Sequence, residues 1–522
     1  MELKSKYLFA DKYTKTAILI TVVFILSSTF VAVYYNPFLS SENTVFYYFT
    51  GTEILEGNGK NVVIPNAPFT TSVMFALTDD PYIHMRIISI LSSAGIVILS
   101  YMITRQILGS RVAIITTMII ALYTGLQRHV YQIDPDVFPI FLLFVSFYFI
   151  TKRKLDSRKI IIISIFVGLS FIMKYQAGII GIGFLIFFLI YTKSRFKNAA
   201  LFLIICFLTV SPLLIYNYVT LGTVITSNSS YLALMEWKNV PKEWYEDDSY
   251  NDSFLLVRDV SLLFQNFGNQ LYYNVFDIIL NFRLGWGWNN LSVFPLIPFI
   301  GMIPLFGGMY FLRKSIPKNL MPFIIAFLVY FPVMSIFANA SNPIRLFPPA
   351  LIIPMFSAVF FTKINKKKIL IPIIIFIIIT NLGASTFMAN WFLFHNDTIY
   401  VWENKILNKQ ELYDIGKILA QEEDIESKYV MSRSNLIAYH ANSNFISLYE
   451  PLLDEDVEKH ITREDWSQWN IYTSNFYSHP QIKGNILEEK PDYLVIEPLK
   501  TIPENWSVMY QSEEYALYKI SK

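Results

Sequence analysis

Long apolar runs, separated by short charged connections, are the feature that most constrains how this chain folds. Of its 522 residues, 54% are hydrophobic and 16% are aromatic, and the mean hydropathy is +0.41. A soluble domain of this length does not need so much apolar surface for its core, so lipid must solvate much of the chain. The sequence therefore predicts a polytopic α-helical membrane protein, because helices satisfy their own backbone groups in hydrocarbon.

Eleven apolar runs approach the ~20 residues that a helix needs to cross about 30 Å of hydrocarbon. The fourth and fifth, Val137–Ile150 and Ile160–Met173, are short for this purpose, and they predict helix ends recessed below the membrane surface. The lysine-rich start of the chain precedes a first run that is too long for a signal peptide, so we expect a retained span. The other runs are Thr16–Tyr35, Ile87–Ile107, Val112–Leu126, Gly178–Tyr191, Ala199–Tyr218, Leu291–Leu312, Leu320–Ala338, Leu346–Phe361 and Ile369–Phe392.

Basic residues fall on alternate connections between these runs. With the N-terminus in the cytoplasm, the inner segments hold 21 lysines and arginines, whereas the short outer connections hold only Arg128, Lys174 and Arg345. This bias follows the positive-inside rule. An odd number of spans then predicts an extracytoplasmic C-terminus.

The chain is expected to form two domains. Residues 1–394 form a transmembrane domain with long outer loops at residues 36–86 and 219–290, and residues 395–522 have the composition of a soluble extracytoplasmic α/β domain. In that second domain we expect a helix over Lys409–Leu419. Strands are expected at Tyr429–Ser432, Asn444–Leu448, Tyr493–Glu497 and Tyr515–Ile520.

Two aspartates, Asp134 and Asp136, flank Pro135 at the predicted outer mouth between the third and fourth spans. Proline interrupts a helix there, so both carboxylates could share a divalent cation such as Mg²⁺ or Mn²⁺. The alternative is structural, with Asp136 capping the fourth helix and complementing its dipole. The two interpretations are compatible, and both remain open.

Other candidate residues lie at the same predicted face. Glu42 is a carboxylate just outside the first span. Lys174 and Arg345 are isolated cations at the outer ends of apolar runs, where they could bind an anion. The alternative is that their side chains only extend toward the membrane surface. Trp286 and Trp288 suit stacking on a sugar ring, although an interfacial aromatic belt is favoured. The histidines have no zinc-like spacing and there is no Gly-rich nucleotide loop, so soluble nucleotide-sugar chemistry is not expected.

This order of features resembles the GT-C class of glycosyltransferases, and in particular the protein O-mannosyltransferase and aminoarabinose-transferase branch. The resemblance covers roughly residues 15 to 390 and rests on a pattern rather than one motif. Its parts are the acidic site after the first span, Gly57-Asn58-Gly59, Pro65-Asn66-Ala67-Pro68, Met85-Arg86-Ile87-Ile88-Ser89, Leu108-Gly109-Ser110-Arg111, the aspartates before the fourth span, and Arg345-Leu346-Phe347-Pro348-Pro349.

The resemblance implies roles for individual residues. The family's acidic residue in the first outer loop acts as general base toward the acceptor, and Glu42 is the position that matches it. The aspartates of the second outer loop, which hold a metal in the oligosaccharyltransferase branch, correspond to Asp134 and Asp136. The lysine that the aminoarabinose branch carries in the proline stretch is missing, since Asn66 lies there, and this argues against that donor.

Together these features predict a glycosyltransferase that moves a sugar from a polyprenyl-phosphate donor to a protein, lipid or glycan acceptor at the outer membrane face. Lys174 and Arg345 would bind the donor phosphate. The net charge of +2 does not indicate a nucleic-acid partner. The alternative is a multi-span transporter or flippase of lipid-linked saccharides, although the sequence lacks the paired halves that many transporters have.

The distribution of basic residues generates a topology prediction. A reporter fused after Lys522 should report an extracytoplasmic location, and one fused at Asp156 a cytoplasmic location, in a paired alkaline phosphatase and fluorescent-protein assay. A cytoplasmic signal from the C-terminal fusion would mean that one of the short runs, Val137–Ile150 or Ile160–Met173, does not cross the membrane.

Overall fold

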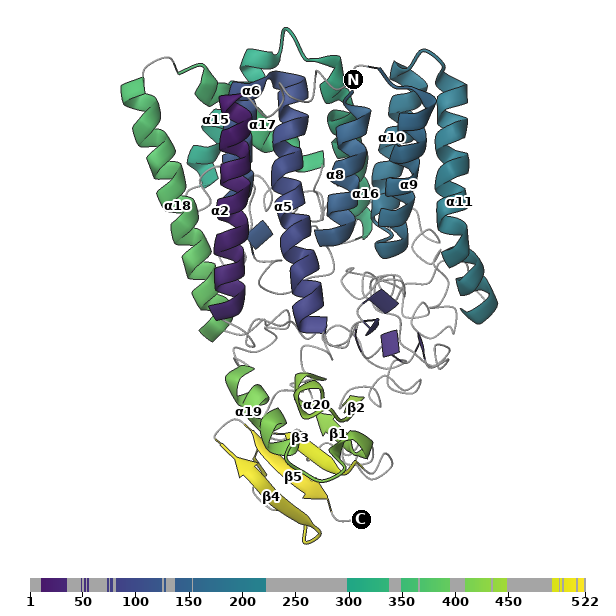
Figure 1. Cartoon of the computed structure of the whole chain (residues 1–522), viewed down its shortest axis with the longest axis vertical. Helices are drawn as coiled ribbons and strands as arrows, with labels where there is room; N and C mark the ends of the chain where they lie inside the picture. Colours follow the sequence, from purple (N-terminus) through teal and green to yellow (C-terminus); the bar gives the residue numbers. More distant parts are fainter. Residues whose placement is uncertain are drawn as a thin grey trace. The chain divides into compact units, whose positions relative to one another are not determined.

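The computed structural model describes two compact units, and each is treated by itself (Figure 1). One is a helical unit and the other is a C-terminal unit with a β-sheet. The described residues are 11–34, 48, 51–52, 54–55, 73–74, 76–77, 81–123, 126–127, 137–152, 154–221, 298–337, 349–364, 367–394, 409–432, 435–447, 491–496, 498–499, 502–512 and 515–520.

Each of the eleven apolar runs overlaps a helix of the helical unit. Two short 3-10 turns, η5 (Lys318–Leu320) and η7 (Pro349–Leu351), lead into α16 and α17. The helices are α2 (Lys12–Tyr34), α5 (Pro81–Leu108), α6 (Ser110–Ala121), α8 (Val137–Ile150), α9 (Ser157–Met173), α10 (Ala177–Tyr191), α11 (Arg195–Leu221), α15 (Pro298–Leu312), α16 (Met321–Phe337), α17 (Ile352–Thr362) and α18 (Lys367–Phe394).

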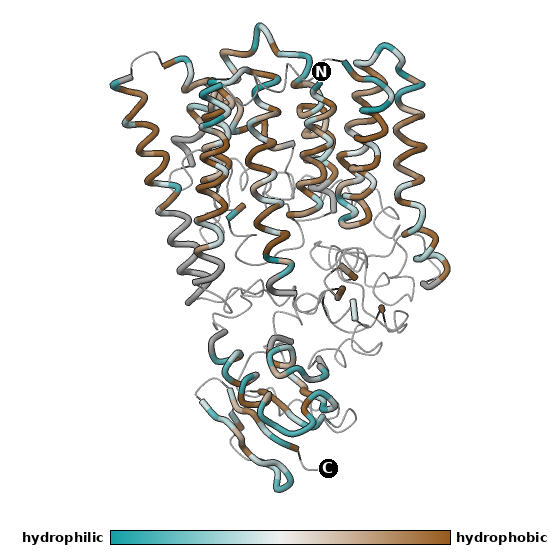
Figure 2. The backbone as a smooth tube through the Cα atoms, in the orientation of Figure 1, coloured by the Kyte–Doolittle hydropathy of each residue, from teal (hydrophilic) through white to brown (hydrophobic). Residues whose placement is uncertain are grey.

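Three helical segments in the described part of the chain are long and apolar enough to cross a membrane, namely Lys12–Phe30, His84–Leu108 and Arg195–Val219. Several other apolar helices are shorter, among them α8 with 14 residues and α10 with 15. The helical character of the chain is confirmed, whereas the number of eleven crossings stays a prediction. The apolar colouring of these helices is visible along most of their length (Figure 2).

Antiparallel packing organises the middle of this unit. Ser170 Oγ donates to the Pro139 carbonyl at 2.8 Å, and Ser146 Oγ lies 3.4 Å from the Ile163 carbonyl, so α8 and α9 run in opposite directions. The Phe147 ring stacks on Phe323 of α16 with centroids 4.2 Å apart. The same ring meets Phe184 of α10 edge-on at 4.7 Å, and this aromatic cluster therefore joins three helices in the core.

A tight turn at Gly109 joins α5 to α6. Its φ of 89° lies in a region that favours glycine, and the turn brings Leu108, Val112, Leu312 and Val359 into one apolar cluster. The end of α5, the start of α6 and the ends of α15 and α17 therefore lie together.

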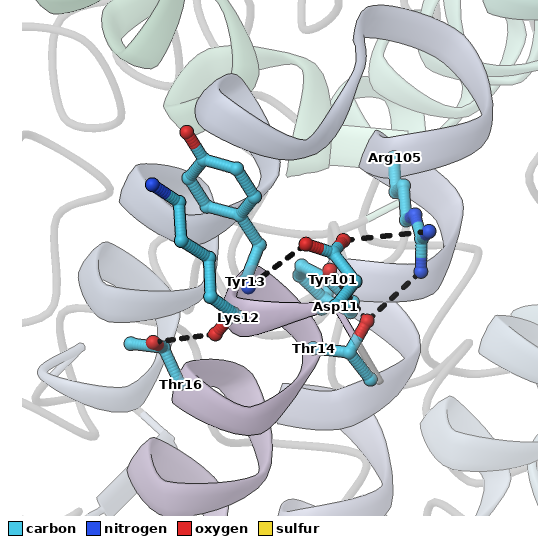
Figure 3. A network of polar contacts seen from close by, with 7 residues as sticks. All are labelled: Asp11, Lys12, Tyr13, Thr14, Thr16, Tyr101 and Arg105. Atoms are coloured by element: carbon cyan, nitrogen blue, oxygen red, sulfur yellow. Dashed lines mark hydrogen bonds and ion pairs between the residues drawn. The ribbon is translucent and has the colours of Figure 1, made fainter. Parts of the chain in front are cut away.

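The start of α2 joins the same region through a polar network (Figure 3). Arg105 donates to Thr14 Oγ1 at 2.9 Å and lies 3.5 Å from the Asp11 carboxylate. Thr14 Oγ1 is also 3.0 Å from the Tyr101 hydroxyl. Because Asp11 and Arg105 are partly exposed, the pair contributes little energy, about 1 kcal/mol or less, but it fixes the register of α2 against α5.

We call this side of the helical unit the basic end, and the side where α5 and α8 begin and α9 ends the opposite end. Hydrophilic residues gather at the basic end, where the start of α2 lies (Figure 2). Its described lysines and arginines are Lys12, Lys15, Arg105, Arg111, Lys152, Lys154, Arg158, Lys159, Lys193, Arg195, Lys197, Arg313, Lys314, Lys318, Lys363, Lys367 and Lys368. Charge is thus segregated along the helix axes, as lipid solvation requires.

The C-terminal unit contains a five-stranded sheet in the order β2-β1-β3-β5-β4. Strand β1 pairs in parallel with β2 and β3, while β5 pairs antiparallel with β3 and β4. The predicted helix and four predicted strands are confirmed, and β4 is an additional strand. The elements are α19 (Lys409–Leu419), η8 (Ile425–Ser427), β1 (Tyr429–Ser432), α20 (Asn435–Ala441), β2 (Asn444–Ser447), β3 (Tyr493–Ile496), β4 (Trp506–Gln511) and β5 (Ala516–Ile520).

Helices α19 and α20 pack together around His440. Its ring lies edge-on to Tyr413, with centroids 4.9 Å apart, and its Cβ faces Gly416, where a larger residue would clash. Burial, with Lys417 nearby, lowers the pKa of His440 from 6.5 to about 4. The folded unit therefore holds this imidazole neutral at pH values where an unfolded chain would protonate it.

The unit should accordingly lose stability as the pH falls from about 6.5 toward 4, because the unfolded state binds the proton more readily. Between pH 7 and pH 5 the loss should be about 2 kcal/mol. Hydrogen exchange of the α19 and α20 peptides in the full-length protein, corrected for intrinsic rates, measures this loss of stability.

A His440→Gln variant is the control for this titration, and its protection should be nearly independent of pH across that range. The other groups of the unit with shifted pKa values titrate elsewhere, since the Lys519 hydrogen bond lowers the pKa of Glu422 below its usual 4.5. An unchanged slope in His440→Gln would show that another group senses the pH.

Candidate functional site

The opposite end of the helical unit carries the candidate site, and unequal helix lengths shape it. Gly95 of α5 lies against Phe141 of α8, and from that shared level α5 continues about 15 Å beyond the start of α8. Cys206 of α11 donates to the Ser164 carbonyl of α9, and α11 continues about 9 Å beyond the end of α9. The ends of α8 and α9 are therefore recessed between longer helices (Figure 1).

Lys174 lies at this recessed level, where it terminates α9. Its backbone is extended, with φ −156° and ψ 113°, and its N–H donates to the Ser170 carbonyl at 2.8 Å. Its own carbonyl accepts from Ala177 N–H at 3.0 Å, so α10 starts immediately afterwards. Lys174 is half-buried, and a cation at this position complements the negative end of the α9 dipole and also suits an anionic ligand.

Tyr175 and Asn217 connect this turn to α11. The Asn217 amide donates to the Tyr175 hydroxyl at 3.3 Å, and the Asn217 side chain is almost completely buried. A buried amide in an apolar helix is costly unless it is hydrogen-bonded. The contact therefore holds Tyr175, the residue that follows Lys174, against α11.

Arg86 is the residue that sequence reasoning missed. Only 8% of it is exposed, and it is the one buried charged side chain in the described part of the helical unit. It belongs to the first turns of α5 at the opposite end. Buried arginines in membrane helices mark ligand or ion sites, because a charge there needs compensation. The signal in the sequence was an arginine at the start of an apolar run, but its burial is visible only in the fold.

Gln127 adds a buried amide after α6. It is 9% exposed, and its Nε2 donates to the Ala121 carbonyl at 3.1 Å. Its Oε1 atom has no hydrogen-bond partner among the described residues. A buried carbonyl of this kind is available to accept a hydrogen bond from a ligand hydroxyl.

Most of the predicted site residues lie outside the described residues, so among them only Lys174 is placed. In the described ranges no group of three or more histidine, cysteine, aspartate or glutamate side chains is arranged to hold a metal. The residues whose predictions the structure does not address are Glu42, Asp134, Asp136, Trp286, Trp288 and Arg345.

Comparisons with known proteins agree with the predicted resemblance. Residues 63–216 match the family of dolichyl-phosphate-mannose-protein mannosyltransferases, a range that includes Arg86, Gln127 and Lys174. No curated protein sequence matches the chain.

Solved structures share the fold along nearly the whole chain. ArnT from Cupriavidus metallidurans bound to undecaprenyl phosphate has 10% identity and a TM-score of 0.58, covering 95% of this chain and 97% of ArnT. Its apo state gives 11% identity, a TM-score of 0.53 and the same coverage. The apo oligosaccharyltransferase from Archaeoglobus fulgidus has 13% identity and a TM-score of 0.52, covering 92% of this chain and 69% of that enzyme.

The helical unit thus shares the fold of these solved structures, which are glycosyltransferases of the GT-C class. Within that class, residues 63–216 carry a domain of the protein-mannosyltransferase type. The predicted resemblance and the enzyme class are thereby confirmed.

The burial of Arg86 generates a prediction about activity. Arg86→Lys keeps the charge but loses the planar fork of donors, so sugar transfer should fall roughly 10-fold or more, since a bidentate arginine is not replaced by lysine. Arg105→Lys, in the same helix but at the basic end, is the matched control and should stay within about 2-fold in rate. Equal losses in both variants, measured at matched melting temperatures, would remove Arg86 from the site.

Proposed function

We propose that the protein transfers a sugar from a polyprenyl-phosphate-linked donor to a protein, lipid or glycan acceptor at the extracytoplasmic face of the membrane. In this proposal all eleven apolar helices cross the bilayer, and the C-terminal domain, residues 395–522, is extracytoplasmic. The observation that carries the proposal is the protein-mannosyltransferase match across α5 to α11 on a fold shared end to end with ArnT.

The donor assignment is supported by the chemistry of the opposite end. A polyprenyl chain keeps its tail in hydrocarbon and its phosphate at the interface, so a binding site needs cations at recessed helix ends. Lys174 lies at the recessed end of α9, and Arg86 is a second, buried cation near the start of α5 at the same end of the unit. ArnT was solved with undecaprenyl phosphate, which is a ligand of this chemical class.

The proposed reaction forms one bond and breaks another at the anomeric carbon. Glu42 accepts the proton of the acceptor hydroxyl while that oxygen attacks the sugar, and the bond to the donor phosphate breaks. Lys174 and Arg345 stabilise the leaving polyprenyl phosphate, and each interaction strengthens as negative charge develops there. As the alternative to an interfacial aromatic belt, Trp286 and Trp288 would stack on the sugar ring.

The test of this proposal is Glu42→Gln, which keeps the shape of the side chain but cannot accept a proton. With a lipid-linked donor that the wild type uses, turnover should fall by about 10²–10⁴, whereas donor binding and thermal stability should be unchanged. The measurement is single-turnover transfer at saturating donor.

The nearby carboxylates provide the controls for Glu42. Glu53→Gln, Asp79→Asn and Asp80→Asn should retain most of the turnover, because these residues fit loop or cap roles. Near-normal activity in Glu42→Gln, together with a loss in one of these variants, would move the base to that other carboxylate.

A second experiment separates metal binding from helix capping at Asp134 and Asp136. If the pair holds Mg²⁺ or Mn²⁺, chelation should abolish transfer, and Asp134→Asn should raise the metal concentration that restores half of the activity. Loss of a cap alone would cost about 1 kcal/mol of stability and leave the metal response unchanged.

The oligosaccharyltransferase from Archaeoglobus fulgidus has also been solved with Zn and sulfate, which supports testing more than one cation. Wild-type transfer that resists chelation would exclude the metal role for the pair. In that case Asp136 would remain as a helix cap.

A further inference from the structure

The starts of α9 and α11 form a cationic surface at the basic end that the transfer reaction does not use. The connecting segments, residues 151–159 and 192–198, contain eight basic side chains and one acidic side chain. Lys193, Arg195 and Lys197 are all exposed. We define the cationic surface as these three residues together with Lys154 and Arg158, which are exposed too.

Helix packing places the two segments beside each other. Cys206 Sγ donates to the Ser164 carbonyl at 3.3 Å, and Gly168 lies against Thr209, so α9 and α11 are parallel neighbours. By that register the first turn of α11 extends about 6 Å beyond the start of α9, to the level of the preceding connection. The positive ends of both helix dipoles therefore add to the same field.

The one carboxylate of the two connecting segments already has a partner. Asp156 caps α9 by accepting from Lys159 N–H at 3.0 Å, and its other oxygen lies 2.8 Å from the Lys159 ammonium. These hydrogen bonds hold the pKa of Asp156 below its usual value. It therefore does not neutralise Arg195 or Lys197.

Hydrogen bonds also order the connection before α11. Asn198 Nδ2 donates to Thr192 Oγ1 at 3.1 Å, and Asn198 N–H donates to the Ser194 carbonyl at 2.9 Å. The three cations consequently project from a fixed turn rather than from a long loop.

An exposed phenylalanine indicates the kind of ligand that binds the cationic surface. Phe196 is 83% exposed between Arg195 and Lys197. At helical spacing it continues a stripe formed by Leu203 and Phe207, which are 50% and 63% exposed. Since such an exposed apolar stripe on a membrane helix faces lipid, its charged end lies at the level of the phospholipid headgroups.

We propose that this cationic surface binds the anionic phospholipid headgroups of the adjoining leaflet, with Phe196 inserted among the acyl chains. Lysines and arginines near a membrane surface attract anionic lipid, and this attraction weakens with salt. The continuity with the lipid-facing stripe favours a lipid over a soluble polyanion. The proposal is independent of the transfer reaction at the opposite end.

The experiment titrates the full-length detergent-solubilised protein with phosphatidylglycerol or phosphatidylcholine and counts bound lipids by native mass spectrometry. The triple variant Lys193→Gln, Arg195→Gln, Lys197→Gln should weaken phosphatidylglycerol binding by roughly 10- to 100-fold. Phosphatidylcholine binding should change little. Higher salt should reduce the difference between the two lipids.

A charge-matched control at another basic connection is Arg313→Gln, Lys314→Gln, Lys318→Gln, which should lose no more than about 3-fold. Phe196→Ser keeps the cations and should weaken both lipids by a similar small factor. If the triple variant fails to fold, Arg195→Gln alone should still weaken phosphatidylglycerol binding about 5-fold.

Three results would each overturn the proposal. The first is equal binding of the two lipids by the wild type, and the second is an equal loss in the charge-matched control. The third is a single-stranded RNA oligonucleotide that binds the wild type more tightly than phosphatidylglycerol does, since this would identify a soluble polyanion as the ligand.

Discussion

Hydrocarbon excludes charge, and the arrangement of the helical unit depends on that constraint. Lysines and arginines lie at the helix ends, and most of the described ones lie at the basic end, where the Asp11–Arg105 network also lies. Arg86 and Lys174 are exceptions, because both are at the opposite end and one of them is buried. Charged side chains inside a membrane mark ligand sites, and the proposed function assigns the donor phosphate to this end of the unit.

The recessed helix ends and the charge segregation act together in the proposed function. At the opposite end, helices α8, α9 and α10 do not reach as far as α5 and α11. Lys174, at the end of α9, is therefore recessed relative to the ends of α5 and α11. A headgroup that enters there leaves bulk water but stays close to cations, and electrostatic interactions strengthen as the local dielectric falls. The basic end, in contrast, presents exposed charge that suits a lipid surface rather than catalysis.

Long apolar runs predict the helices well, because lipid solvation selects helices wherever a run is long and apolar. The run Val137–Ile150 coincides with α8, whereas α9 begins earlier than its apolar run because Asp156 caps it at Ser157. The sequence does not predict strand β4, because it is an edge strand with no buried residue and depends on pairing with β5. Arg86 lies within one of the motifs, but the sequence predicts no role for it, since burial arises from tertiary packing that local sequence does not reveal.

Cleavage of a lipid-linked donor is the most direct test of the central claim, because a transferase breaks the sugar-phosphate bond and a flippase leaves it intact. Purified protein should be incubated with a panel of polyprenyl-phosphate sugars carrying a label in the sugar, together with protein, lipid and glycan acceptors. For at least one pair, we expect polyprenyl phosphate to be released in a 1:1 ratio with labelled acceptor, at a rate proportional to enzyme. Donors that cross between leaflets of proteoliposomes while remaining intact would contradict the account.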